Sequence, residues 1–267
     1  MIFRSRFSAQ QRWGAFVAIA LLLASCSTVE TPTEVGSADD SLQTAEAPIP
    51  TPAANSDLTA GLPRLDGKAT VEIMVGSKPI TVELDGSKAP YTAGNFVDLA
   101  EKGVYDGTIF HRVVTTPTPF VAQGGDPQSV DPNVKTSQLG TGNYIDPATG
   151  QVRSVPLEIT PAGADEPVYG TTFKSVGLDM PPALPHSKGA IAMARSGVNT
   201  ASAQFYITLA DVNFLDGDYA VFGYVTDGMN VVDNIQLGDV IQSVKVTSGA
   251  DNLVQPSADE GAEAAAE

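Results

Sequence analysis

Apolar and polar residues alternate along several short stretches of the chain, which is the pattern of β-strands with one buried face. Residues 69–75 and 80–84 alternate in this way on either side of a Gly-Ser-Lys-Pro turn, and this arrangement predicts a β-hairpin. Further strands are predicted, from the same kind of pattern, at residues 108–113, 189–195, 205–209, 220–226 and 241–247.

Two stretches follow a helical period instead. Residues 92–102 begin after Pro90, end at Gly103 and place Phe96 and Leu99 on one face, which predicts a helix. Residues 229–235 predict a shorter one. Many short strands with two helices favour a mainly β domain, an antiparallel barrel or sandwich with helical covers.

The first 25 residues predict an export signal, because three arginines precede an apolar run from Trp13 to Leu23. This run is shorter than the roughly 20 apolar residues that a membrane span needs. Residues 13–29 carry no charge, so a marginal anchor helix is an alternative. The sequence Leu-Ala-Ser-Cys that ends at Cys26 resembles the box of bacterial lipoproteins, which predicts Cys26 as the lipidation site. An ordinary cleaved signal with an incidental cysteine is the other reading.

Composition divides the rest of the chain. Residues 26–62 are rich in Thr, Ser, Ala, Pro and acids and contain no Lys or Arg, which predicts a disordered tether. The folded domain is expected at 63–249, and residues 250–267 are expected to be an acidic, solvated tail.

Charge and composition exclude several functions. With 15 basic and 31 acidic residues among 267, the chain has a net charge of −16 and no general attraction for nucleic acid or anionic lipid. The single cysteine excludes an intrachain disulfide and a cysteine-based zinc cluster, and two histidines argue against a multi-histidine metal site. Phosphate-binding loops and hydrolase nucleophile motifs are absent from the sequence.

Three segments carry the chemistry. The first is Phe-His-Arg-Val-Val at 110–114, followed by Phe-Val-Ala-Gln-Gly-Gly-Asp at 120–126. The second is Gly-Ala-Ile-Ala-Met-Ala-Arg at 189–195, followed by Ser-Ala-Gln-Phe-Tyr-Ile at 202–207. The third is Asn-Phe-Leu-Asp-Gly-Asp-Tyr-Ala-Val-Phe-Gly at 213–223. Together they resemble the cyclophilin family of peptidyl-prolyl cis-trans isomerases, over about residues 68–247.

The resemblance implies a closed eight-stranded antiparallel β-barrel capped by two α-helices, with the substrate groove on its outer face. It implies rotation about X–Pro bonds in proline-containing polypeptides, with no metal and no cofactor. By position, the catalytic group comprises Arg112, Phe120 and Gln123. The residues that match the substrate-binding surface are Val121, Ala194, Arg195, Ser196, Gln204, Tyr206, Phe214, Leu215 and Tyr219.

The chemistry of the reaction explains these residue types. Rotation about an X–Pro bond has a barrier of about 18–20 kcal/mol, because the nitrogen is conjugated with the carbonyl. Catalysis requires an apolar slot for the proline ring and a cation that interacts more strongly with the twisted bond than with either planar isomer. Arginine suits this role because it stays protonated and donates from a rigid fork. Without the motifs, Arg112 would be an ordinary solvated charge, and the apolar residues could be core.

The chain departs from the family in five places. Phe214 replaces a tryptophan, and Tyr219 replaces a histidine found in many eukaryotic members. We therefore expect only weak cyclosporin binding, since an indole donor is lost. Arg195 stands where asparagine is common, and the segment from Arg112 to Phe120 is three residues longer than usual. Residues 127–188 follow the family poorly and are expected to form long loops.

The sequence thus predicts an exported, lipid-anchored and monomeric prolyl isomerase, facing a periplasm or lumen, that assists the folding of exported proteins. Two non-enzymatic alternatives remain at this point. The domain could be a tethered proline-peptide binding module or chaperone without significant turnover, or its barrel could serve only as the scaffold of an assembly lipoprotein.

Overall fold

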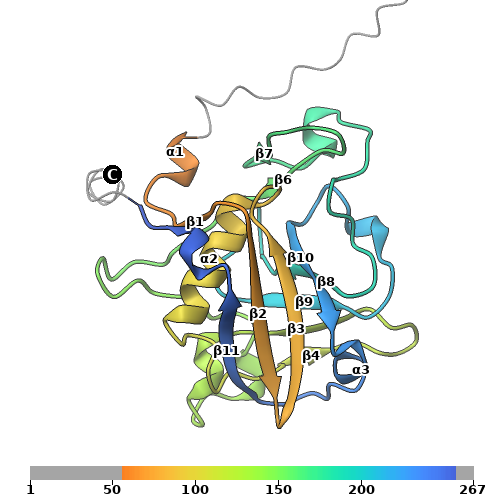
Figure 1. Cartoon of the computed structure of the whole chain (residues 1–267). Helices are drawn as coiled ribbons and strands as arrows, with labels where there is room; N and C mark the ends of the chain where they lie inside the picture. The colour runs from red at the N-terminus through yellow and green to blue at the C-terminus, as the bar shows by residue number, and fades with distance from the viewer. Residues whose placement is uncertain (1–55, 257–267) are drawn as a thin grey trace, which may run out of the picture. The chain divides into compact units, whose positions relative to one another are not determined.

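The computed structural model describes residues 56–256. The predicted export signal, Cys26, most of the predicted tether and residues 257–267 lie outside the described part of the chain. Within it, the dominant feature is one antiparallel sheet of eight strands (Figure 1). In spatial order the strands are β11 (Ile241–Ser248), β2 (Lys68–Val75), β3 (Lys78–Asp85), β10 (Val221–Asp227), β8 (Ala190–Met193), β9 (Phe205–Thr208), β5 (Val121–Gly124) and β4 (Arg112–Val113).

The sheet is strongly curled, and the chain segments that precede its two outer strands meet. Ile109 and Val240 form an antiparallel bridge, and the N–H of Phe110 donates to the carbonyl of Asp239 at 2.9 Å. The expected eight-stranded antiparallel barrel is therefore confirmed in its strand number and direction. Closure comes from this short bridge, whereas the residue pattern predicts a continuous strand at 108–113.

Alternate residues of the strands fill the interior of the curled sheet. In β2 and β3 every second side chain is buried, which is the alternation that predicted the hairpin. Aromatic rings occupy the centre, where the ring of Phe96 lies 4.9 Å from that of Tyr105 and 5.3 Å from that of Phe205. The interior is therefore a packed core without room for a substrate, and the site has to lie on the outside.

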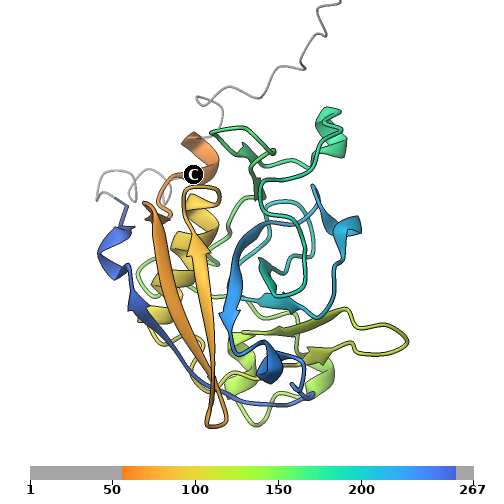
Figure 2. The same cartoon turned by 45° about the vertical axis from the view of Figure 1, so that its right-hand side comes forward.

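The helix predicted at 92–102 is α2 (Pro90–Glu101), which lies behind the β2–β3 hairpin in Figures 1 and 2. Pro90 begins it, and the buried carboxylate of Glu158 accepts hydrogen bonds from the free N–H groups of Tyr91 and Thr92 at 3.2 and 2.8 Å. The second predicted helix is shorter than expected. As α3 (Met229–Val232) it ends three residues before residue 235, and the chain continues in turns.

Ordered structure continues beyond both ends of the predicted domain. A short helix, α1 (Ser56–Thr59), precedes it. Strand β1 (Arg64–Leu65) pairs with β12 (Leu253–Val254), which follows a 3-10 helix at Ala250–Asn252. Residues 250–254, which composition assigned to the tail, therefore belong to the described fold.

Loops make up most of residues 127–188, and they contain only short elements. These are the strand pair β6 (Glu158–Ile159) and β7 (Val168–Tyr169), and 3-10 helices at Pro127–Val130, Thr136–Gln138 and Lys174–Val176. A further 3-10 helix, Asn213–Leu215, follows β9.

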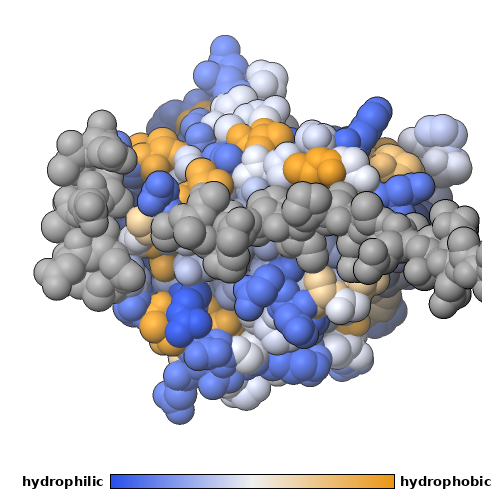
Figure 3. All heavy atoms as spheres, turned by 90° about the horizontal axis from the view of Figure 1, so that it is seen from above, coloured by the Kyte–Doolittle hydropathy of each residue, from blue (hydrophilic) through white to orange (hydrophobic). Residues whose placement is uncertain are grey.

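Two features are absent from residues 56–256. None of the helices in this range is long and apolar enough to span a membrane, and no group of three or more His, Cys, Asp or Glu side chains in it could hold a metal ion. Seen from above, apolar residues form small separate areas among polar ones (Figure 3).

Candidate active site

The strand register brings the motif residues into one row across the sheet. Arg112 on β4 pairs with Gln123 on β5, Gln123 pairs with Tyr206 on β9, and Tyr206 pairs with Ala192 on β8. Residues that pair directly across neighbouring strands share a face. The adjacent row, which includes Ala122 and Ile207, points into the core. Arg112, Gln123 and Tyr206 therefore lie together on the outer face.

This outer face carries its own apolar cluster, separate from the barrel core. Its buried members are Val121, Ala190, Ala192, Tyr206 and Val221, and the partly buried side chains packed on them include Phe120, Ala194, Leu215 and Tyr219. A cavity of about 230 Å³ opens above the cluster. It is lined by Arg112, Phe120, Val121, Gln123, Ala194, Arg195, Tyr206, Leu215 and Tyr219. We call it the first cavity.

A chain of polar side chains runs along one edge of the first cavity. Nη1 of Arg112 donates to Oε1 of Gln123 at 3.4 Å, and Nε2 of Gln123 donates to Oε1 of Gln204 at 3.2 Å. Nε2 of Gln204 in turn donates to the carbonyl of Gly142 at 2.7 Å. The guanidinium of Arg112 also lies 5.6 Å from the centre of the Phe120 ring, within the range of a cation–π contact. Arg112 is exposed, but these partners restrict where its charge can lie.

A buried hydrogen-bond chain supports the opposite wall. The ring of His186 is fully buried, with Nε2 2.9 Å from the hydroxyl of Tyr206 and Nδ1 2.7 Å from Oδ1 of Asp216. Burial lowers the pKa of His186 and raises that of Tyr206. The neutral ring therefore donates from Nδ1 to Asp216 and accepts from Tyr206. Asp216 directly follows Leu215 in the sequence, so these hydrogen bonds connect Tyr206 on the floor of the cavity to the segment of Leu215 at its rim.

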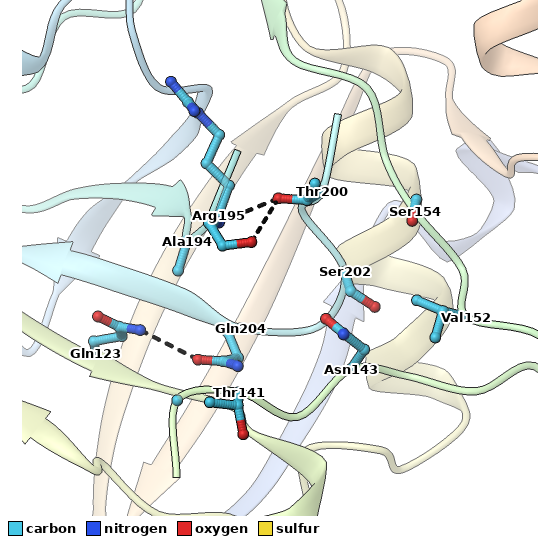
Figure 4. A pocket seen from close by; sticks show the side chains of 12 residues that line it. Gln123, Thr141, Asn143, Val152, Ser154, Ala194, Arg195, Thr200, Ser202 and Gln204 are labelled. Carbon is cyan, nitrogen blue, oxygen red and sulfur yellow. Dashed lines mark hydrogen bonds between the residues drawn. The ribbon is translucent and has the colours of Figure 1, made fainter. Parts of the chain in front are cut away.

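A second cavity of about 450 Å³ adjoins the first and shares Gln123, Ala194 and Arg195 with it (Figure 4). Polar neutral side chains dominate its lining, among them Thr141, Asn143, Ser196, Thr200, Ser202 and Gln204. Residues 140–143 reach it because Asp126, which is fully buried, accepts from the N–H groups of Gly140 and Gly142 at 2.6 and 3.2 Å.

The comparison with protein-family models decides the family. The model described as cyclophilin type peptidyl-prolyl cis-trans isomerase matches residues 70–254, more than half of the chain. The chain belongs to this family.

Cyclophilins of several organisms are similar to it. A Synechocystis protein named as a thylakoid lumen peptidyl-prolyl cis-trans isomerase is 42% identical over 206 residues, which cover 73% of this chain and 51% of that one. A chloroplastic peptidyl-prolyl cis-trans isomerase of Arabidopsis thaliana is 38% identical over 215 residues, covering 73% of this chain and 46% of that one. The chain thus spans about half the length of these two relatives.

Among solved structures, a cyclophilin of Cryptosporidium parvum in the presence of the dipeptide Ala-Pro matches with a TM-score of 0.50 and 25% identity. The match covers 67% of this chain and 99% of that one.

The structure gathers most of the residues that the cyclophilin motifs single out. Nine of the twelve predicted peptide-contacting residues line the first cavity, and Ser196 and Gln204 line the second. Phe214 lines neither. It is 72% exposed, and its ring stacks on Phe120 at 5.7 Å.

Sequence reasoning missed part of the surroundings of this cyclophilin site. The motifs single out neither His186 nor Asp216, although both residues support the wall of the first cavity. Thr141 and Asn143 were assigned to loops. Sequence periodicity does not indicate such residues, because long-range hydrogen bonds determine their positions. The hydrogen bonds from Gly140 and Gly142 to Asp126 are an example.

Proposed function

We propose that this chain catalyses cis–trans isomerisation of X–Pro bonds, with the proline ring in the first cavity and Arg112 beside the prolyl nitrogen. One observation carries the proposal, namely that the hydrogen-bonded guanidinium of Arg112 lies at the rim of a cavity whose floor is the apolar cluster of Val121 and Tyr206. Membership of the cyclophilin family supports it.

The cavity supplies the two elements that the reaction needs. Phe120, Leu215 and Tyr206 offer an apolar surface that holds the ring of proline while the preceding carbonyl turns. As the bond twists, conjugation is lost and the nitrogen lone pair becomes localised. A guanidinium donor at the nitrogen stabilises this state more than either planar isomer, which lowers the barrier. Gln123 restricts the position of Arg112, and Gln204 restricts that of Gln123.

The test is exchange NMR on a blocked Ala-Pro peptide with the full chain and its Arg112→Ala variant. Loss of such a donor is expected to lower kcat/KM about 10²-fold. Arg64→Ala is the matched control, because Arg64 is an exposed arginine outside both cavities. If Arg112→Ala keeps more than a tenth of the activity, the electrostatic role is wrong. Full peptide affinity without turnover in the unmodified chain would favour the binding module instead.

We further propose that the chain is exported and anchored through a lipid on Cys26, and that its clients are exported proteins. The residues at 23–26 support this, since the only cysteine of the chain falls in the lipoprotein-like box. The Synechocystis relative, which is named for the thylakoid lumen, also supports export. Mass spectrometry of the mature N-terminus tests the anchor, with Cys26→Ser as control. An unmodified cysteine, or an N-terminus elsewhere, would contradict it.

A further inference from the structure

The arginines of the described residues fall into two classes. Outside the two cavities, Arg64 lies 3.6 Å from the carboxylate of Asp66, and Arg153 is paired with the carboxylates of Asp98 and Asp146. The other two arginines in residues 56–256 are Arg112 and Arg195, and both line the first cavity. Neither guanidinium has a carboxylate of a described residue within 4.0 Å, so both are available to form an ion pair with a bound ligand.

The two adjoining cavities together form a groove, and the charge of this groove is opposite in sign to that of the domain around it. Residues 63–249 contain 20 acidic and 12 basic residues. In the described linings of the two cavities, however, Arg112 and Arg195 are the only charged residues, and Asp, Glu and Lys are absent. A positive groove on a negative protein attracts negatively charged segments and repels positive ones.

Arg195 is held in position without losing its charge. Its Nε and Nη2 donate to the backbone carbonyl of Asp218 at 3.1 and 2.6 Å, and its guanidinium lies 4.5 Å from the centre of the Tyr219 ring. A neutral carbonyl and an aromatic face orient the cation but do not neutralise it, and three of its five N–H donors remain. Figure 4 shows the guanidinium pointing away from Thr141 and Gln204. The cation therefore serves the Tyr219 side of the first cavity rather than the interior of the second.

We propose that the groove selects X–Pro segments in which a residue next to the proline is Asp or Glu. This inference rests on the proposed function, since it assumes that proline occupies the first cavity. A side chain that neighbours the proline then lies at the wall that Arg195 forms. A carboxylate there accepts hydrogen bonds from the remaining N–H groups of the guanidinium, whereas the ammonium group of a lysine is repelled by the positive charge of Arg195.

Two series of blocked peptides test the selection on the full chain, Ala-Xaa-Pro-Ala and Ala-Ala-Pro-Xaa, with Xaa as Glu, Gln or Lys. Exchange NMR gives kcat/KM for each peptide, and chemical-shift changes give its Kd. In at least one series we expect the Glu peptide to exceed the Lys peptide about tenfold in kcat/KM, with Gln between them. Because the groove is open to solvent, 1 M NaCl should reduce this ratio.

Arg195→Gln should reduce the Glu-to-Lys ratio at least threefold. Lys245→Gln removes the same charge from an exposed position on β11, outside both cavities, and should leave the ratio unchanged. A ratio within twofold in both series, a preference for Lys, or a ratio that survives Arg195→Gln would overturn the inference. If no peptide is turned over at all, the proposed function fails instead, and the Kd values still decide the charge preference.

Discussion

Replacing His186 with phenylalanine tests whether the buried hydrogen-bond chain holds the wall of the first cavity. The change keeps an aromatic ring against Tyr206, on which the imidazole stacks with ring centres 6.1 Å apart. It removes the hydrogen bonds of Nε2 to Tyr206 and of Nδ1 to Asp216. The backbone N–H of residue 186 still donates to Asp216, at 2.8 Å in the unmodified chain.

The expected cost follows from the groups that lose their partners. Tyr206 is only 4% exposed, and a buried hydroxyl without a partner costs about 1–3 kcal/mol. Asp216 loses less, because it also accepts from Asn213 at 3.0 Å. We expect His186→Phe to lower the free energy of unfolding by about 2–4 kcal/mol. For a domain of this size, this corresponds to a fall in Tm of roughly 5–15 °C.

A double-mutant cycle with Tyr206→Phe isolates the bond itself. In the unmodified chain, Tyr206→Phe strands Nε2 of His186 and should destabilise by about 1–2 kcal/mol. In the His186→Phe background the hydroxyl is already unpartnered, so its removal should cost nothing and should restore part of the lost stability. Urea unfolding of the four proteins should therefore give a coupling energy of at least about 1 kcal/mol. Additivity within about 0.5 kcal/mol would refute the reasoning, whatever the size of the single effects.

Two further predictions concern stability. In α2, a Cβ on Gly94 would lie 2.5 Å from backbone atoms of Pro63 and Arg64. Gly94→Ala should therefore lower the free energy of unfolding, measured in urea, by at least about 2 kcal/mol. In an exposed helix the same change raises the free energy of unfolding by about 1 kcal/mol. A stabilised variant would contradict the packing of α2 against β1. Burial lowers the pKa of His111, which faces Asp126 and Arg112, and that of His186, which faces Asp216 and Tyr206. At these two histidines the unfolded chain therefore takes up protons first as the pH falls below about 6.5, and their contribution to stability should decline from pH 7 to 5.5 by at most about 1.4 kcal/mol per pH unit for each histidine. Burial raises the pKa of Glu158, which acts in the opposite direction, so the decline is measured as the difference in urea midpoint between the unmodified chain and His186→Phe. A difference that does not change with pH would contradict the prediction.

Local patterns were sufficient to predict the strands with one buried face. The alternation in residues 69–75 and 80–84 corresponds to β2 and β3, because one side of each strand faces the core and the other faces solvent. β5 was not predicted. All of its residues are buried or half-buried, since its outer face forms the floor of the first cavity, and its four residues show no alternation.

Motifs predicted the first cavity better than periodicity predicted the fold. Arg112, Gln123 and Tyr206 come from three segments of the sequence, and the register of β4, β5 and β9 places them in one row. Side chains that act through long-range contacts gave no such signal. Glu158 accepts a hydrogen bond from the N–H of Thr92 in the first turn of α2, although the two residues are 66 positions apart in the sequence. This contact depends on the tertiary structure alone.

The two cavities differ in what holds them, and this difference determines which can change independently. The first cavity is tied to the register of β4, β5, β8 and β9, and a slip by one residue would turn Gln123 and Tyr206 into the core. The second depends on a loop that one buried carboxylate, Asp126, holds through the N–H groups of Gly140 and Gly142. A substitution at Thr141 or Asn143 therefore alters the second cavity without disturbing the sheet. The residues that the proposed isomerisation needs are thus fixed by the barrel, while the lining of the second cavity can vary with the loop.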